Sequence, residues 1–202
     1  MKKITPLLLL LASLPSLANA NLLINGSFES DVQASGTWNI YKNLIGWTGQ
    51  RLGGIELRNN NAGTASDGFN FVELDTTFNS SMFQTVDTVN GAIYDLSFDY
   101  SGRAGVNKLS NGIKAFWNGV ELASFTASGL GKTDNNWFSL EFQVVGTGHD
   151  KLSFAATGIS DSFGGSLDNV NLVTAVPEPE NLMLLLAGLG LLAYVSRRRR
   201  AV

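Results

Sequence analysis

Ile93-Tyr94-Asp95-Leu96-Ser97-Phe98-Asp99-Tyr100 is the stretch that decides the fold class. Its apolar and aromatic residues alternate with Asp95, Ser97 and Asp99, so the two groups would lie on opposite faces of an extended chain. The same period of two recurs from residue 138 to 144 and from 152 to 156. This alternation is typical of strands that bury one face, and it predicts a β-rich core.

A tight hairpin is predicted at Asn118-Gly119, which separates the stretches Ile113–Trp117 and Val120–Phe125. Both residues readily adopt the positive φ angles of a type I′ turn. Further strands are expected at residues 22–24, 54–57, 69–74, 82–86 and 167–172. No stretch between residues 21 and 175 shows a sustained apolar repeat of 3.6 residues, so the sequence predicts an all-β domain, an antiparallel sandwich or barrel.

Composition excludes several classes of function. Only 15% of the 202 residues are charged, no cysteine is present, and His149 is the single histidine. Disulfides, thiolate zinc sites and multi-histidine metal sites are therefore ruled out, and His149 itself is expected to be a solvated turn residue. Without the basic and acidic residues of the two ends, residues 21–175 carry a net charge of about −7, which argues against nucleic acid as a partner.

Residues 1–20 are predicted to be a secretory signal peptide that directs the chain to the Sec machinery. Lys2 and Lys3 supply the positive start, Leu7–Leu11 form a short apolar segment, and Ala18-Asn19-Ala20 is a small-x-small cleavage site. Cleavage would leave Asn21 as the first residue. The alternative is an uncleaved membrane anchor, which the prolines and the short apolar run disfavour.

Residues 176–202 form a second signal. Val176-Pro177-Glu178-Pro179 is followed by an apolar run over residues 182–195 and by four arginines, Arg197, Arg198, Arg199 and Arg200. The run is shorter than the roughly 20 residues that span a bilayer, and the arginines would hold their end in the cytoplasm. A plain tail anchor is the alternative to a sorting signal.

This three-part order resembles the PEP-CTERM sorting signal of Gram-negative bacteria. The resemblance implies membrane insertion through the C-terminal helix, processing by an inner-membrane exosortase, and delivery to the cell surface or the extracellular matrix. Both ends are therefore read as addresses, and residues 21–175 as one β-sandwich domain.

Two carboxylates, Glu29 after the first predicted strand and Asp168 in the last, suggest a cation clip. Calcium prefers six to eight oxygen ligands, and a clip that joins distant parts of the chain would stabilise a domain without disulfides. The alternative is that Glu29 and Asp168 are solvated or cap backbone N–H groups.

The domain also resembles the galactose-binding-like jelly-roll superfamily, including the plant cell-wall domain-of-unknown-function type and carbohydrate-binding modules. The matching segments are residues 21–29, 46–47, 54–57, 71–75, 84–86, 94–100, 117–119, 158–162 and 167–170. In the calcium-binding members, the matching acids hold a structural ion. That implies Glu29 and Asp168 as ligands here, assisted by carbonyls near Asn25 and Ser27.

A carbohydrate platform is expected at Trp38, Tyr41 and Trp47, which lie in a Gly-rich, loop-like stretch, with Arg58 and Asn59 close in sequence. Sugar rings stack on exposed aromatic faces while nearby polar groups bind the hydroxyls. Burial in the core is the alternative for each aromatic residue, and it is the expectation for Phe98, Phe142, Phe154, Trp117 and Trp137.

Catalysis is not expected. Glu56, Glu73, Asp75 and Asp99 could supply paired carboxylates for glycoside hydrolysis, but alternate strand residues share a face by geometry alone. Arg103 is predicted to be the salt-bridge partner of a neighbouring carboxylate. The sequence therefore predicts a non-catalytic exported protein that binds polysaccharide, such as exopolysaccharide. The alternatives are an adhesive surface protein without sugar specificity and, less favoured, a glycan-active enzyme.

Overall fold

The computed structural model describes residues 20–50, 53–175, 186–192 and 196. The described residues contain twelve strands and a short helix over residues 186–192. The strands are Thr37–Tyr41 (β1), Asn43–Leu44 (β2), Trp47–Gln50 (β3), Ile55–Asn59 (β4), Asn70–Glu73 (β5), Ser81–Asp87 (β6), Ile93–Ser101 (β7), Gly112–Trp117 (β8), Val120–Thr126 (β9), Phe138–Val145 (β10), His149–Thr157 (β11) and Ser166–Thr174 (β12).

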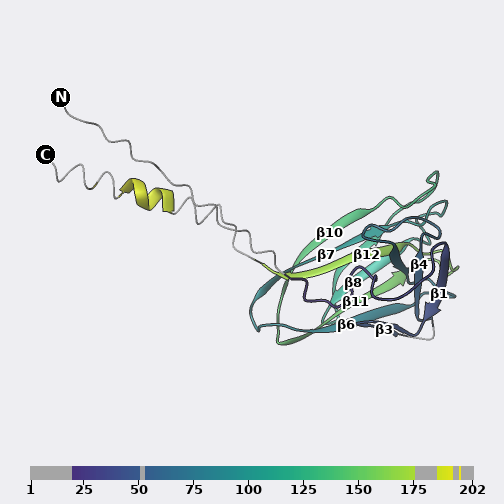
Figure 1. Ribbon diagram of the computed structural model, residues 1–202, viewed down its shortest axis with the longest axis horizontal. Helices are drawn as coiled ribbons and strands as arrows, with labels where there is room; N and C mark the ends of the chain where they lie inside the picture. Colours follow the sequence, from purple (N-terminus) through teal and green to yellow (C-terminus); the bar gives the residue numbers. More distant parts are fainter. Residues whose placement is uncertain (1–19, 51–52, 176–185, 193–195, 197–202) are drawn as a thin grey trace, which may run out of the picture.

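The strands form two antiparallel sheets of six. The first sheet has the order β1-β4-β5-β12-β7-β10, and the second has the order β2-β3-β6-β11-β8-β9. Figure 1 shows β10, β7 and β12 above β8, β11, β6 and β3, as the two layers of a sandwich. The predicted all-β antiparallel sandwich is confirmed.

The core lies between the sheets, and the period of two decides which side chains enter it. Tyr94, Leu96, Phe98 and Tyr100 of β7 are all buried in one apolar cluster with residues of the second sheet. Phe98 meets Phe154 of β11 edge to face, with 5.0 Å between ring centroids. The alternation that predicted a strand therefore also positions the largest rings of the core.

The predicted hairpin is present as β8 and β9. Asn118 has φ 51° and Gly119 has φ 81°, both in the left-handed region that a type I′ turn requires. Trp117 pairs with Val120 across the turn, and its side chain is buried, as expected.

The start of the domain differs from the prediction. Residues 22–24 form bends and a turn rather than a strand, but they still lie along β12. The Leu22 N–H donates to the Leu172 carbonyl (2.8 Å), and the Val170 N–H donates to the Gly26 carbonyl (2.9 Å). The two ends of the domain therefore meet, as the sequence predicted.

The prediction that the stretch around residues 37–50 is loop-like is wrong, because this stretch forms β1, β2 and β3. These strands are rich in Asn, Thr and Gly, so they lack the apolar alternation that identifies β7.

Most of the two predicted signals falls outside the described residues. The signal residues that the structure does not describe are 1–19, 176–185, 193–195 and 197–202. The signal peptide and the bounds of the domain, 21–175, therefore stay predictions. Within the described part of the chain, no helix has the length and apolar character needed to cross a membrane.

Candidate functional site

The outer face of the first sheet carries a group of buried charges. Ile55, Leu57 and Val72 point into the core, so their neighbours Glu56, Arg58 and Glu73 point to the opposite face. Glu56 lies directly across from Glu73 in the pairing of β4 with β5. All three side chains are nearly inaccessible to solvent.

Two arginines join these carboxylates. Arg58 Nη2 contacts Glu56 Oε1 and lies 3.0 Å from Glu73 Oε2. Arg103, in the loop after β7, places Nη1 3.2 Å from Glu73 Oε2 and donates to the Ser162 carbonyl at the same distance. The prediction that Arg103 is a salt-bridge partner is therefore confirmed.

A cavity of about 280 Å³ lies over this group. We call it the aromatic hollow, and its lining residues are Trp38, Ile40, Glu56, Arg58, Thr76, Thr77, Arg103, Ser162 and Phe163. Trp38 is 51% exposed and Phe163 is 48% exposed. The guanidinium carbon of Arg58 lies 5.9 Å from the Trp38 ring centroid, and that of Arg103 lies 4.8 Å from the Phe163 ring, so each arginine also orients a ring.

Burial shifts the pKa values of the ionisable groups at the floor of the hollow, by which we mean the lining residues Glu56 and Arg58 and the groups beneath them. Loss of solvent raises the pKa of Glu73 to about 8, although Arg58 and Arg103 both act to lower it. Burial also raises the pKa of Glu56, against the opposing effect of Arg58. Tyr100 has its pKa raised as well, because its hydroxyl is buried and near the charge of Glu73.

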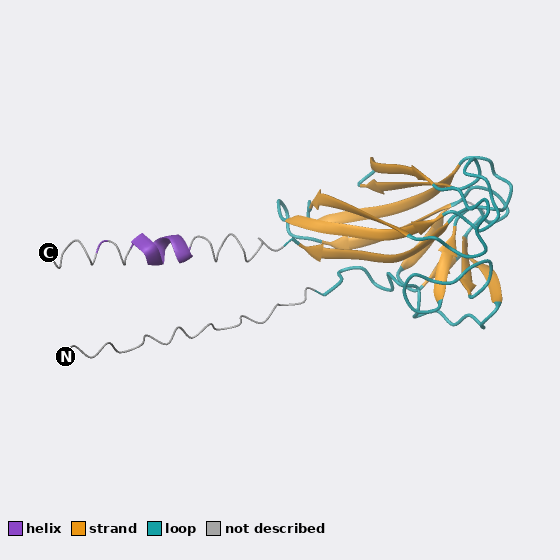
Figure 2. Ribbon diagram, turned by 90° about the horizontal axis from the view of Figure 1, so that it is seen from above, coloured by secondary structure: helices purple, strands orange, loops and turns teal. Residues whose placement is uncertain are grey.

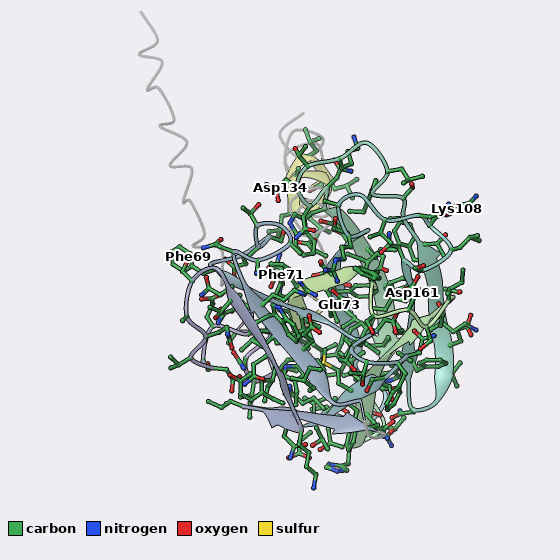
Figure 3. The ribbon with its side chains drawn as sticks, turned by 90° about the vertical axis from the view of Figure 1, so that its right-hand side faces the viewer. Phe69, Phe71, Glu73, Lys108, Asp134 and Asp161 are labelled. Atoms are coloured by element: carbon green, nitrogen blue, oxygen red, sulfur yellow. The ribbon has the colours of Figure 1, made fainter. Side chains whose placement is uncertain are left out.

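Buried carboxylates also fix the loop that carries Phe163. Asp75 Oδ2 accepts the N–H groups of Asp161 and Ser162, each at 3.0 Å, and Glu73 Oε1 accepts the Gly164 N–H at 2.7 Å. Figure 3 looks onto this end of the sandwich and shows Glu73 near the middle of the view, with Asp161 in the loop to its right. The position of the Phe163 ring is therefore set by two carboxylates, that of Glu73 in β5 and that of Asp75 just after β5.

A larger hollow of about 420 Å³ lies elsewhere on the first sheet. It is lined by Asp95, Leu96, Ser97, Glu141, Phe142, Gln143 and Val173. Phe142 packs against the core, and the Gln143 amide donates to Asp95. This hollow lacks a half-exposed ring, so we take the smaller aromatic hollow as the better candidate site.

The structure brings together two of the five predicted carbohydrate residues. Trp38 pairs with Arg58 in the register of β1 with β4, and both line the aromatic hollow. Trp47 is a correction: it is 1% exposed, packs against Phe28 and Phe154, and donates its indole N–H to the Asn25 carbonyl. A ring buried in this way cannot serve as a stacking platform.

Tyr41 and Asn59 do not line the hollow, and their part in sugar binding stays a prediction. Tyr41 is partly buried against the core and donates its hydroxyl to Gln33 Oε1. The Asn59 amide donates to the Gln33 carbonyl and to Asn70 Oδ1, which ties β4 to its neighbours. Arg58 itself is buried, so it acts from the floor rather than from an open surface.

Sequence reasoning missed Phe163 as a site residue. It lies in a Gly- and Ser-rich loop without any periodic pattern, and the fold alone brings it to Arg103. Trp137 was expected in the core but is half-buried, edge-on to Phe71 at 6.0 Å.

Three of the four predicted calcium ligands, Glu29, Asp168 and Asn25, form hydrogen bonds within the protein. Asp168 Oδ2 accepts the N–H groups of Ser66 (2.7 Å) and Asp67 (2.9 Å), and Glu29 Oε1 accepts those of Phe69 and Asn70. Both carboxylates therefore bind the segment 66–70. Burial raises the pKa of Asp168 to about 7, although these N–H groups act to lower it.

Asn25 does not fit a calcium ligand as it stands. Its carbonyl accepts Trp47 Nε1 and the Phe28 N–H, and its side chain binds Asp31, Ser30 and Ile45. Ser27 is half-buried in the same turn. The described residues contain no group of three acidic or histidine side chains placed to hold a metal ion. An N–H group aimed at a carboxylate competes with a cation for the same lone pair, so the geometry favours the capping alternative, and calcium stays a prediction.

Solved carbohydrate-binding modules share this fold. A family 61 module in complex with β-1,4-galactotriose superposes with a TM-score of 0.50 at 20% identity, over 77% of this chain and 99% of that one. A family 16 module gives the same TM-score at 14% identity, over 76% and 99%. At these identities the similarity shows the fold alone, a jelly-roll β-sandwich, and the predicted fold class is confirmed. No curated protein sequence matches the chain.

The C-terminal end matches a family model described as the PEP-CTERM protein-sorting motif, over residues 175–200. The chain carries a PEP-CTERM sorting motif. The match includes the predicted residues Val176 to Pro179 and Arg197 to Arg200, whose structure lies outside the described residues. The PEP-CTERM motif supports export and exosortase-dependent sorting of the chain.

Proposed function

We propose that the jelly-roll domain binds polysaccharide without catalysis, and that the aromatic hollow receives the sugar. The observation that carries this proposal is the pair of half-exposed rings, Trp38 and Phe163, which border one cavity above a polar floor. Sugar C–H groups stack on such rings, and the partly exposed Arg103 and the exposed Thr77, which also line the hollow, are suited to bind hydroxyls. The shared fold with modules that bind sugars supports this assignment.

The floor is better suited to binding than to bond cleavage. Both oxygens of Glu73 are held, one by the Gly164 N–H and the other by Arg58 and Arg103. A general acid or nucleophile must reach the scissile bond, whereas this carboxylate is 1% exposed and already fully engaged.

Affinity electrophoresis in polysaccharide gels tests the proposal. We expect the wild-type domain to be retarded by at least one neutral polysaccharide, and Trp38→Ala and Phe163→Ala to lose most of that retardation. Removing a stacked ring costs about 1 kcal/mol or more, roughly a fivefold loss of affinity. Phe138→Ala removes a similarly exposed ring at the opposite edge of the first sheet, on β10, and is the matched control.

Equal retardation of Trp38→Ala and wild type would exclude the aromatic hollow as the site. Absence of retardation by every polysaccharide, including the host's own exopolysaccharide, would favour the adhesive surface protein without sugar specificity. Thermal melting of each variant separates loss of binding from loss of folding.

We further propose that the host is a Gram-negative bacterium and that the chain passes through an inner-membrane intermediate. The cell surface or extracellular matrix is the proposed destination, where a binding domain for exopolysaccharide would meet its ligand. The PEP-CTERM motif supports this route.

A further inference from the structure

The charged groups that line the aromatic hollow, taken together with the carboxylates directly beneath them, carry no net positive charge. Three carboxylates, those of Glu56, Glu73 and Asp75, lie within electrostatic range of one another, against the guanidinium groups of Arg58 and Arg103. The net charge of these five groups is −1 when all are ionised and zero when Glu73 holds a proton. The lining residues include no further lysine, arginine or histidine.

Both arginines are already engaged. Arg58 uses Nη2 for Glu56 and Glu73 and Nη1 for Asn61 Oδ1, and Arg103 uses Nη1 for Glu73 and the Ser162 carbonyl. An anionic ligand could form a strong pair with either arginine only by displacing a buried carboxylate. That displacement would leave the carboxylate without its partner, which is costly in a buried site.

Two polar atoms of the floor still lack a hydrogen-bond partner among the described residues. They are Arg58 Nε, a donor, and Glu56 Oε1, which remains in ion-pair contact with Arg58 Nη2. A carboxylate or sulfate group only accepts, and it would place a second negative charge beside Glu56.

The size of the hollow restricts the ligand further. At about 280 Å³ it lies at the lower limit of small-molecule sites, which span roughly 300–1,000 Å³. It therefore has room for a single sugar ring and little more.

We infer that the aromatic hollow selects an uncharged sugar unit, and that Glu56 and Glu73 are specificity-determining residues that exclude uronates and sulfated sugars. This inference rests on the proposed sugar binding and adds the chemical class of the ligand. Glu73 acts by keeping Arg58 and Arg103 occupied, and Glu56 acts by the negative charge that it places at the lining of the hollow.

The test compares matched ligands by isothermal titration calorimetry. The probes are neutral trisaccharides (cellotriose, β-1,4-galactotriose and β-1,4-mannotriose) and their C6-oxidised counterparts, in which each CH₂OH is a carboxylate. Wild-type protein should bind at least one neutral trisaccharide more tightly than its oxidised counterpart, by about tenfold or more. Measured at about pH 9, where Glu73 is ionised, Glu73→Gln removes the charge that engages the two arginines and should reduce that ratio at least severalfold.

Glu121→Gln is the control for overall charge. Glu121 lies on β9, is largely exposed and pairs with Lys114, so the variant changes the net charge equally but away from the hollow. The ratio of its affinities for a neutral trisaccharide and for the oxidised counterpart should equal that of wild type. If Glu73→Gln does not fold, Glu56→Gln carries the test, because it also removes a carboxylate from the floor.

The outcomes separate the two proposals. Equal or tighter wild-type binding of an oxidised trisaccharide, or an unchanged ratio in Glu73→Gln and Glu56→Gln, would overturn the selection of uncharged sugars while leaving sugar binding intact. Failure to bind every probe would overturn the proposed function and the selectivity with it.

Discussion

Asp150 is a fully buried carboxylate that joins three turns of the second sheet. It accepts hydrogen bonds from the Thr88 hydroxyl, the Asn118 amide, and both the N–H and the hydroxyl of Thr147. Burial alone would raise its pKa, but these hydrogen bonds outweigh that effect and lower the pKa to about 2. The carboxylate therefore favours the folded state most strongly when it is ionised.

Asp150→Asn should lower the free energy of unfolding by about 1–3 kcal/mol at pH 7, because it puts an N–H donor where donors converge. The pKa of Asp150 is lower in the folded than in the unfolded chain. Its contribution is therefore fully present above pH 4 and is lost as the pH falls towards 2. Urea unfolding at pH 7, 4 and 2.5 should show that the difference in the free energy of unfolding between wild type and variant becomes smaller between pH 4 and pH 2.5.

Asp87→Asn is the control for this measurement, because Asp87 is exposed and pairs only with the exposed His149. Its effect should stay within about 0.5 kcal/mol. A gap for Asp150→Asn that is the same at pH 2.5 as at pH 7 would contradict the assigned linkage.

The side chains of the candidate site were only partly predictable. Trp38 and Arg58 were identified because an aromatic and a cation lay near each other in sequence, and the pairing of β1 with β4 does bring them together. Trp47 looked equivalent in sequence, yet it enters the core, because nothing in a Gly-rich stretch reveals which face a residue takes. Phe163 depends on contacts with Arg103, which lies 60 positions away.

At the scale of elements, Gly26 is the point where the chain start meets β12. A Cβ atom at this position would lie 1.9 Å from the Val170 carbonyl oxygen, so a side chain cannot be accommodated unless the backbone moves. The Val170 N–H also donates to the Gly26 carbonyl. The pairing of the two ends of the domain therefore requires glycine here.

Gly26→Ala should lower the free energy of unfolding by more than 2 kcal/mol, since it separates the chain start from β12. Gly119→Ala provides the comparison, because Gly119 has φ 81° but open space around its missing Cβ. It should cost only about 1–2 kcal/mol, the cost of a left-handed conformation. Chemical denaturation of both variants measures the two losses in the free energy of unfolding. A larger loss for Gly119→Ala than for Gly26→Ala would refute the prediction.

Elements with a strong local pattern were predictable, and the others were not. β7 and the β8–β9 hairpin follow from alternation and from Asn118-Gly119, which are local signals. β1 to β3 escaped prediction, because their Asn, Thr and Gly residues carry no strand pattern and are held by pairing of β1 with β4, of β3 with β6 and of β2 with β3. Tertiary pairing outweighs local preference there.

At the scale of the whole molecule, the sequence could predict two layers but not the order of the strands. β12 lies between β5 and β7, so the last strand of the domain is central in its sheet. This order depends on contacts between residues far apart in the chain, such as Ser166 with Glu73. A single sequence contains no signal for such pairings.

The PEP-CTERM motif leads to a prediction about the exported form. Intact-mass measurement in a host that has an exosortase should show a chain that begins at Asn21 and lacks Arg197–Arg200. Glu178→Ala, within the Val176-Pro177-Glu178-Pro179 motif, should instead leave a membrane-bound form that keeps the arginines.

Glu180→Ala changes an acidic residue directly after Val176-Pro177-Glu178-Pro179, within the matched segment 175–200, and should be processed as in wild type. An exported wild-type chain that retains Met1 or the terminal arginines would contradict this processing.

The direction of β12 places the aromatic hollow and the end of the chain that carries the sorting motif at opposite ends of the domain. Phe163 precedes the start of β12, whereas the tail follows Thr174 at its other end, and nine residues at about 3.3 Å each separate the two by about 30 Å. Figure 2 shows the loops crowded at the end of the sandwich opposite the exit of β12. A copy attached through the part of the chain that follows Thr174 would have the aromatic hollow at the far end of its domain. A repeating polymer could then engage several copies at once, and such multivalency can raise overall avidity by about 10²–10⁴ over a single weak contact.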